Sequence, residues 1–419
     1  MLLDAKQICL NSINKCLPDS ATIECLNKLN IEDEVYLLAV GKASFSMAKA
    51  ASKILNIKKG IVISKYGHIL DKLDNIDCYE AAHPISDING INATKKIIEL
   101  CSNLNSNDKV VFLLSGGASA LFEDPLIPLD ELQDLNNQML KKGLDIIEIN
   151  TIRKKLSNVK GGKLAKLCEP AKVYSIILSD VLDDRLEFIG SGPTISDEAD
   201  SKKALDIINK YNLDLSKQAL NIIQNSKPII VNNSSNYIIG SVKLLCEYAK
   251  NEAIKLGYEP IVISNHINIE ARDAGNLLFD NIKKYINDNK NYCLIMTGET
   301  TVHVKGNGIG GRNQELVFSQ IKNISDLNNV LIMSLGSDGT DGPTDAAGGY
   351  VDTNTYELLK SKNINYEEIL NNNDTYNGLK AINQLIITGP TGTNVNDISI
   401  ALIKKGEWLW NMLLLMVIS

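Results

Sequence analysis

No part of the 419-residue chain carries the concentrated positive charge that a nucleic-acid-binding surface requires. The chain has 43 Lys and Arg residues against 50 Asp and Glu residues, so its formal net charge is −7. The basic residues are scattered along the sequence and form no stripe or block. We therefore expect no nucleic-acid partner.

The chain also lacks CxxC pairs, and its eight cysteines and four histidines show no spacing typical of a metal site. We interpret the cysteines as buried free thiols in a reducing compartment, which predicts a cytoplasmic protein. The N-terminus has an early acidic residue and no long apolar run, so we expect no signal peptide. The apolar stretch Leu409–Ile418 has about ten residues, well short of the roughly 20 that span a bilayer, and we expect no membrane partner.

Length and composition predict two α/β domains. A chain with 44% hydrophobic and 22% charged residues is typical of globular proteins, and 419 residues exceed one ordinary core. Apolar runs of strand length alternate with helical patterns, as in α/β folds. We place the boundary at Lys227-Pro228, which gives domains at 1–227 and 228–406 and an atypical apolar tail at 407–419. The sequence shows no fixed-period repeat and no low-complexity linker.

Three strand ends in the first half carry residues suited to anion chemistry. Glu34–Val40 precedes Lys42, Lys109–Leu114 precedes a turn of small residues, and Val173–Leu178 precedes Asp180. Open α/β sheets bind ligands at the carboxyl ends of their strands. We predict that Lys42 contacts a ligand, that Asp180 accepts a proton or binds a metal, and that the turn binds an anion through Ser115, Gly116, Gly117 and Ser119. Ordinary tight turns are the alternative.

A glycine-rich segment dominates the second half of the chain. Its glycines lie between strand signals at Tyr292–Met296 and Thr301–Val304 and a helical pattern that starts near Asn313. Glycine lets the backbone approach an anion, and a helix N-terminus presents free N–H groups. Lys305 and Arg312 flank the glycines, and Arg312 can bind phosphoryl or carboxylate oxygens bidentately. We predict phosphate binding at Gly308, Gly310 and Gly311; the alternative is a hairpin with two solvated cations.

Carboxylates cluster after the strand expected at Asn329–Leu335. Asp338, Asp341 and Asp345 fall within eight residues and alternate with glycines. Oxygen ligands of this kind suit Mg²⁺ beside a phosphate, so we predict that Asp338 and Asp341 bind metal. The alternative is a plain turn, because Asp-Gly and Gly-Pro dipeptides commonly form turns.

A further polar loop follows the last strand that we expect, Gln384–Ile387. It is rich in glycine and threonine, like the loops after the earlier strands. We predict that Thr391 and Asn394 contact phosphate there. His83 precedes a helical pattern, and we expect a structural role for it, because a lone histidine usually has one.

Taken together and in order, these motifs resemble those of the glycerate 2-kinases whose C-terminal domain is called MOFRL. The matching stretches cover residues from about 35 to 402. They are Val40-Gly41-Lys42-Ala43, His83-Pro84, Ser115-Gly116-Gly117-Ala118-Ser119, Asn150 with Arg153, Lys160-Gly161-Gly162, Ser179-Asp180-Val181, Ser191-Gly192-Pro193-Thr194, Gly298-Glu299-Thr300-Thr301, Gly310 to Glu315, Gly336 to Gly342 and Thr388 to Asn394.

The resemblance implies transfer of the γ-phosphoryl group of ATP to the 2-hydroxyl of D-glycerate, with Mg²⁺ or another divalent cation. It implies a Rossmann-like N-terminal domain with a mostly parallel sheet, a smaller MOFRL-type α/β domain, and an active site in the cleft between them. Lys42, Asp180 and Arg312 would be catalytic. Phosphoryl transfer depends on positioning and charge stabilisation, which two cations and a hydroxyl-orienting carboxylate supply. The expected partners are the substrates D-glycerate and ATP. A homodimer is one of the assemblies that the sequence allows.

Two other classes of function remain open at this point. An NAD(P)H-dependent hydroxypyruvate reductase is one, because members of the family carry that label and the glycines at 306, 308 and 311 spell GxGxxG. Asp338 stands where a ribose-binding acid would be expected, although Lys305 and Arg312 beside the glycines suit phosphate better. A nucleotide-binding regulator without catalysis is the other, and it would need none of the three catalytic residues.

Overall fold

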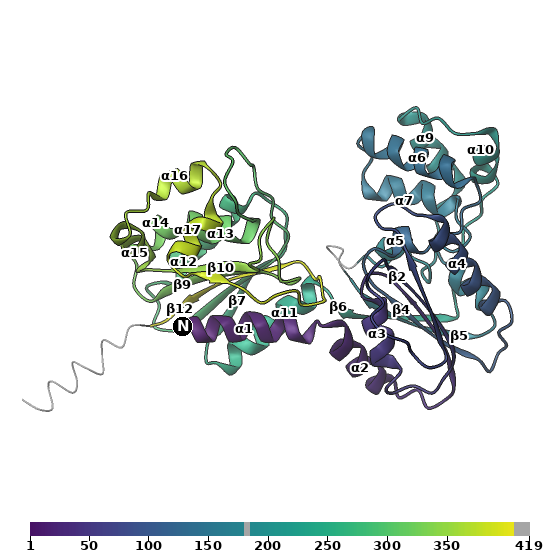
Figure 1. The fold of residues 1–419 in the computed structure, drawn as a ribbon, viewed down its shortest axis with the longest axis horizontal. Coiled ribbons are helices and arrows are strands. Elements are labelled where there is room, and N and C mark those ends of the chain that lie inside the picture. The colour runs from purple at the N-terminus through teal and green to yellow at the C-terminus, as the bar shows by residue number, and fades with distance from the viewer. Residues whose placement is uncertain (180–184, 406–419) are drawn as a thin grey trace, which may run out of the picture. The chain divides into compact units, whose positions relative to one another are not determined.

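The computed structural model describes residues 1–179 and 185–405, which form two compact units (Figure 1). One unit consists of residues 18–240, and the other combines residues 1–17 with the chain from residue 241 onward. Each unit has its own six-stranded sheet with helices packed against it. The expected two-domain α/β architecture is therefore confirmed.

The first unit is built around a sheet in which all neighbouring strands are parallel. The strand order is β3-β2-β1-β4-β5-β6, the doubly wound Rossmann order whose direction of winding reverses between β1 and β4. The strands are β1 (Val35–Val40), β2 (Ile57–Lys65), β3 (Ile76–Ala81), β4 (Lys109–Leu114), β5 (Lys172–Leu178) and β6 (Ser234–Gly240). The central strands β1 and β4 are almost wholly buried, which explains their continuous apolar sequences.

Helices of the first unit pack on the sheet and also form a separate group. Helices α6, α7, α9 and α10 gather away from the sheet (Figure 1) around a core of their own that includes Leu135, Ile152 and Ile223. The helices are α2 (Pro18–Leu29), α3 (Ser44–Ala51), α4 (Ile88–Cys101), α5 (Ala118–Leu121), α6 (Leu129–Lys141), α7 (Ile146–Lys155), α8 (Lys163–Leu167), the 3₁₀ turn η2 (Ile189–Ser191), α9 (Ser201–Lys210) and α10 (Lys217–Gln224).

The second unit has a mixed sheet of order β11-β10-β9-β12-β8-β7. Strand β12 lies antiparallel between β8 and β9, whereas β7 and β8 are parallel. The start of β12 therefore meets the ends of β8 and β9 at one edge of the sheet. The strands are β7 (Glu259–Ile267), β8 (Tyr292–Gly298), β9 (Val330–Gly336), β10 (Gly348–Asp352), β11 (Leu385–Ile386) and β12 (Asp397–Ile403).

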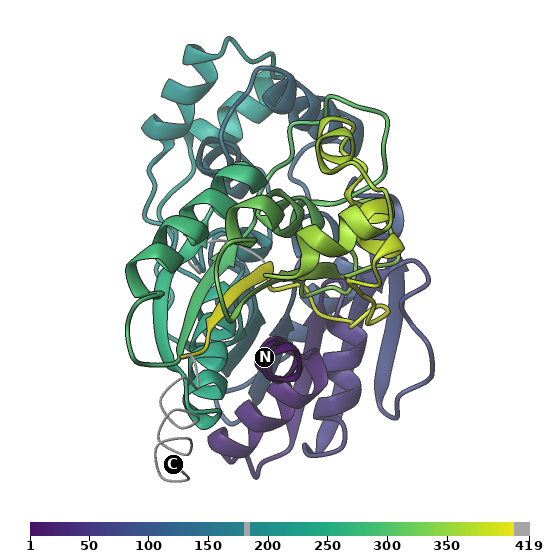
Figure 2. The same cartoon turned by 90° about the vertical axis from the view of Figure 1, so that its left-hand side faces the viewer.

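Two layers of helices cover this second sheet. Helices α1 (Leu2–Lys15) and α11 (Val242–Lys255) pack together on one face, and the remaining helices lie on the other (Figures 1 and 2). A core that includes Leu278, Leu316 and Phe318 joins that second layer to the sheet. The helices of this layer are α12 (Ala271–Tyr285), α13 (Arg312–Ser319), α14 (Ile321–Ile324), α15 (Thr355–Ser361), α16 (Tyr366–Asn371) and α17 (Thr375–Ala381).

The division between the units lies later in the chain than the expected Lys227-Pro228 boundary. Residues 228–240 belong to the first unit, because β6 pairs in parallel with β5. Ile229 also forms an isolated antiparallel bridge to Asp197 of the same unit. The apolar tail expected at 407–419 lies outside the described residues.

Two of the predicted strands differ from the structure. Thr301–Val304 is not a strand, and Thr301 makes a single bridge to Glu270. The expected last strand is the two-residue edge strand β11, and the true last strand is β12, which begins at Asp397. Among the described residues, no helix is long and apolar enough to cross a bilayer.

Candidate active site

Lys42 and the small-residue turn after β4 lie together at the point where the first sheet reverses its winding. The main-chain N–H of Lys42 donates to the carbonyl oxygen of Gly116 at 2.9 Å, and the N–H of Ala43 donates to Ser115 Oγ at 3.0 Å. Two neighbouring parallel strands therefore deliver an exposed lysine and a glycine turn to one place. This is the position at which doubly wound sheets bind ligands.

His83 belongs to the same neighbourhood, which the sequence did not indicate. A Cβ atom added at Gly117 would lie 3.0 Å from His83 Cδ2 and 3.1 Å from Lys42 Cγ, so both side chains flank the turn. Burial lowers the pKa of His83, and the positive charges of Lys42 and Lys65 lower it further. The lowered pKa favours the neutral imidazole, which is able to accept one hydrogen bond and donate another.

A half-buried arginine and a buried lysine hold the turn around Ser119 in place. Arg153 Nη2 and Lys160 Nζ donate to the Ser119 carbonyl oxygen at 2.8 and 2.9 Å. Burial lowers the pKa of Lys160 to about 8, and the nearby carboxylate of Glu123 opposes this shift. Ser119 Oγ lies 3.4 Å from Ser191 Oγ, so the hydroxyl is only weakly held and keeps capacity for a further hydrogen bond.

Asp180, the predicted base, lies outside the described residues. Strand β5 pairs with β4 up to Ile177 and ends at Leu178, at the same edge of the sheet as Ser115.

Arg312 is the first residue of α13 and is held by a carboxylate that sequence reasoning missed. Its Nε and Nη2 atoms donate to Asp397 Oδ2 and Oδ1 at 2.6 and 3.0 Å, and its Nη1 lies 2.9 Å from Glu299 Oε1. Burial raises the pKa of Asp397 to about 6, and the hydrogen bonds from Arg312 oppose that shift. Asp397 opens β12, which lies beyond Gln384–Ile387, the last strand that the sequence predicts.

Asp341, one of the two predicted metal ligands, caps the N-terminus of α13, although it is not part of that helix. Its Oδ1 and Oδ2 atoms accept the main-chain N–H groups of Asn313 and Gln314 at 3.0 and 2.9 Å. The Asp341 side chain is almost wholly buried. The first N–H groups of a helix lack acceptors within the helix, and this carboxylate supplies acceptors for two of them.

The glycine-rich segment before α13 packs against another loop of the same unit. Five consecutive main-chain N–H groups, those of residues 305–309, donate to residues 372–374 at 2.8 to 3.1 Å. These groups include the N–H of Gly308, one of the predicted phosphate ligands. Gly310 and Gly311 follow at the start of α13.

Asp338 and Thr391 are brought together, as expected for neighbouring loops. The Thr391 N–H donates to the Asp338 carbonyl oxygen at 3.1 Å, and its Oγ1 donates to the Ser337 carbonyl oxygen at 2.5 Å. Asp338 Oδ1 accepts two hydrogen bonds from Thr340. Asn394 Oδ1 accepts the N–H of Asn396 at 3.2 Å and so shapes the turn that leads into β12.

The described residues suit a Mg²⁺ ion that is bound partly by phosphate, and not one that is held by protein side chains alone. Within residues 1–179 and 185–405, no three His, Cys, Asp or Glu side chains gather as a complete metal cage. Mg²⁺ in phosphotransfer sites is typically held by one or two carboxylates together with phosphate and water. Asp338 is half-buried and offers one such carboxylate, whereas both oxygens of Asp341 are engaged by α13.

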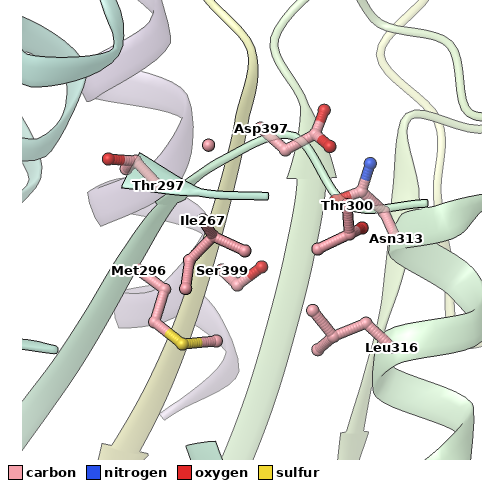
Figure 3. Close-up of a pocket in the computed structure, with 9 residues that line it drawn as sticks. Ile267, Met296, Thr297, Thr300, Asn313, Leu316, Asp397 and Ser399 are labelled. Carbon is pink, nitrogen blue, oxygen red and sulfur yellow. The ribbon is translucent and has the colours of Figure 1, made fainter. Parts of the chain in front are cut away.

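A small cavity lies beneath the Arg312–Asp397 pair. Figure 3 shows Asp397, Thr300 and Asn313 at its upper end and Met296 and Leu316 below them. Its volume is about 10 Å³, the lower limit for one water molecule. The cavity is therefore too small for a substrate, and we do not assign the substrate site to it.

Comparison with known proteins shows a match to a known domain family in each half of the chain. Residues 4–224 match the model of a domain of unknown function, DUF4147, and residues 292–397 match the MOFRL family. The D-glycerate 2-kinase of Thermotoga maritima is 47% identical over 407 residues, covering 95% of this chain and 97% of that protein. The glycerate 2-kinase of Pyrococcus horikoshii is 37% identical over 423 residues, covering 96% and 95%.

A solved structure agrees with these relatives. The crystal structure of a glycerate kinase from Thermotoga maritima superposes with a TM-score of 0.90 at 45% identity, covering 96% of this chain and 98% of that one. The chain therefore belongs to the family of the glycerate 2-kinases, with a MOFRL domain in its C-terminal half.

Proposed function

We propose that the protein transfers the γ-phosphoryl group of ATP to the 2-hydroxyl of D-glycerate, giving 2-phosphoglycerate and ADP. The placement of Lys42 beside the Ser115–Gly117 turn, where the first sheet reverses its winding, carries this proposal. A positive charge and a glycine turn are what a phosphoryl group in transfer requires. The names of the similar proteins support the choice of D-glycerate as the acceptor.

Each proposed residue has a distinct task in this reaction. Lys42 and Arg312 stabilise the negative charge that spreads over the transferred group. Ser115, Gly116, Gly117 and Ser119 bind phosphate oxygens, and Gly308, Gly310, Gly311, Thr391 and Asn394 shape or contact the phosphates from their own loops. Asp180 orients or deprotonates the attacking hydroxyl. A bound divalent cation supplies further positive charge beside the phosphates, and Asp338 is the carboxylate that we assign to it.

An enolase-coupled assay tests this function. The purified protein is incubated with D-glycerate, ATP and Mg²⁺, and phosphoenolpyruvate is measured without phosphoglycerate mutase, so that only the 2-phosphate gives a signal. We expect rapid product formation by the wild type and a kcat roughly 10² to 10³ lower in Lys42→Ala. Lys49→Ala is the matched control, because Lys49 is an exposed lysine of α3 that pairs with Asp71 across 3.6 Å.

The same assay separates the competing functions. A signal that requires phosphoglycerate mutase would mean phosphorylation of the 3-hydroxyl. No signal, together with oxidation of NAD(P)H by hydroxypyruvate, would establish a reductase instead. ATP binding without turnover of either substrate would establish a nucleotide-binding regulator.

A further inference from the structure

The guanidinium group of Arg312 is bound on two sides by carboxylates of very different exposure. Asp397 takes Nε and Nη2, and its side chain is only 6% exposed. Glu299 takes Nη1, and its side chain is 52% exposed. The two contacts therefore differ in how readily they break, because an exposed ion pair contributes little to stability, whereas breaking a buried pair leaves a charge without a partner.

Asp397 is fixed by the sheet itself. It lies on β12 between Gly298 of β8 and Gly336 of β9, so the pairing of β12 with two neighbouring strands holds its main chain in place. Arg312 is fixed by the start of α13, which Asp341 caps. The main chains of Asp397 and Arg312 are both held in place, and two parallel hydrogen bonds join their side chains. These constraints fix the orientation of the guanidinium plane.

Glu299 occupies the one edge of Arg312 that Asp397 leaves open. With both carboxylates ionised, the group of three side chains carries a net charge of −1, and Asp341 adds a further negative charge nearby. An incoming phosphate or carboxylate is repelled unless one of these carboxylates withdraws. Because Glu299 is half exposed, it is the carboxylate that is able to leave.

We propose that Asp397 is the positioning residue of Arg312. Glu299 covers Nη1 of Arg312, and an anionic oxygen of the substrate displaces Glu299 from this nitrogen when it binds. This inference rests on the assignment of Arg312 to the proposed kinase reaction. The anion that displaces Glu299 is a phosphoryl group of ATP or the carboxylate of glycerate. Both would accept from the same Nη1 atom, and separate titrations of the two substrates distinguish them.

The first test is Glu299→Gln, which removes the charge and keeps the size of the side chain. We expect the KM of one substrate to fall two- to fivefold, with kcat within twofold of the wild type, because the substrate no longer competes with an ion pair. A lower KM for ATP would assign the site to phosphate, and a lower KM for D-glycerate would assign it to the carboxylate. Glu259→Gln is the control, since Glu259 is another exposed glutamate in an ion pair, with Lys290 at 2.8 Å.

The second test is Asp397→Asn with Asp397→Glu as the conservative variant. An amide accepts through one oxygen only, so we expect kcat to fall at least tenfold with less change in KM, and we expect the glutamate to restore part of it. Thermal unfolding of each variant shows whether the loss reflects folding. A kcat lost in proportion to the folded fraction would overturn the positioning role.

A calorimetric titration with ADP and with inorganic tripolyphosphate keeps this inference separate from the proposed function. Tighter binding of tripolyphosphate to Glu299→Gln than to wild type would support the phosphate form of the inference even in a protein without glycerate kinase activity. Unchanged binding together with unchanged KM values for both substrates would overturn it. A wild type that is inactive in the enolase assay would contradict the proposed function alone.

Discussion

At the scale of single residues, the Asp341 carboxylate joins the loop after β9 to the start of α13. We expect Asp341→Ala to lower the free energy of unfolding by about 1 to 3 kcal/mol, because buried N–H groups of Asn313 and Gln314 lose their acceptors. Urea unfolding followed by circular dichroism measures this change. A variant of unchanged stability that needs far more Mg²⁺ for activity would instead support the metal role that the sequence predicts.

Asp338→Asn is the companion variant. Asp338 is half-buried, and its Oδ1 atom accepts hydrogen bonds only from Thr340 in the described part of the chain. We expect stability within about 0.5 kcal/mol of the wild type and a higher Mg²⁺ concentration for half-maximal activity. Activity measured across a Mg²⁺ titration checks this, and an unchanged Mg²⁺ requirement would remove Asp338 from the metal site.

The raised pKa of Asp397 predicts a specific dependence of stability on pH. Burial raises its pKa to about 6 from a usual value of 3.8, so the folded protein holds this proton over a pH range in which the unfolded chain releases it. Stability therefore falls as the pH rises from about 4 to about 6, by a contribution on the order of 3 kcal/mol. The difference in unfolding free energy between wild type and Asp397→Asn, measured at several pH values, should change across this window and stay level above it.

The sequence carries local signals for Lys42 and Arg312 but none for Asp397, for a physical reason. Lysine after an apolar strand and arginine after glycines are local signals, and the structure places both at sheet edges or helix starts. Asp397 acquires its role only because β12 inserts between β8 and β9, which brings it to an arginine 85 residues earlier in the chain. A pairing at that separation leaves no local pattern.

At the scale of elements, the glycine-rich segment owes its glycines to close packing. A Cβ atom at Gly308 would lie 2.5 Å from Asp374 Cβ and 2.6 Å from the Asn372 carbonyl oxygen. We expect Gly308→Ala to lower the free energy of unfolding by about 1 to 3 kcal/mol, because the segment must move away from residues 372–374. Thermal unfolding measures this loss.

Nucleotide binding by the same variant separates packing from phosphate recognition. Calorimetry with ADP should give a Kd for the folded Gly308→Ala protein close to that of the wild type if the N–H of Gly308 serves only the Asn372 carbonyl. A normal melting temperature with a Kd raised tenfold or more would show that this glycine binds phosphate.

Buried central strands were the most predictable elements of the fold. Lys109–Leu114 was predicted with the exact bounds of β4, because strands covered on both faces are continuously apolar. Strand β6 was missed, since it is an edge strand of polar composition whose residues are mostly half-exposed. Strand β12 was also missed; it begins with the charged residue Asp397, which pairs with Arg312.

At the scale of the whole molecule, residues 1–17 belong to the same unit as residues 241–405. Helix α1 packs against α11, and Tyr258 donates to Asp4 Oδ2 at 2.6 Å. Thr393 Oγ1 donates to the Cys16 carbonyl oxygen at 2.8 Å. The amphipathic sequence of α1 predicts a helix with one buried face, but it carries no information on which of two sheets that face covers.

Removal of residues 1–15 should therefore weaken the C-terminal unit and leave the parallel sheet intact. The deletion exposes the surface that buries Ile8, Cys9 and Ile13, which costs on the order of 5 kcal/mol. Hydrogen–deuterium exchange measured by mass spectrometry should show faster exchange in α11 and β12, and unchanged exchange in β1 and β4.

A point variant tests the same dependence without shortening the chain. Glu252 of α11 has a 5% exposed side chain and accepts hydrogen bonds from Asn11 and Lys15 of α1 at 3.2 Å, and these contacts, after that of Lys255, lower its pKa to about 2. Glu252→Gln should speed exchange in α1 and α11, because the charge that holds the two helices is lost. Glu24→Gln, which breaks an exposed pair within α2, should change neither. Faster exchange in β1 and β4 after the deletion would mean that α1 stabilises the N-terminal sheet as well, against the division into units.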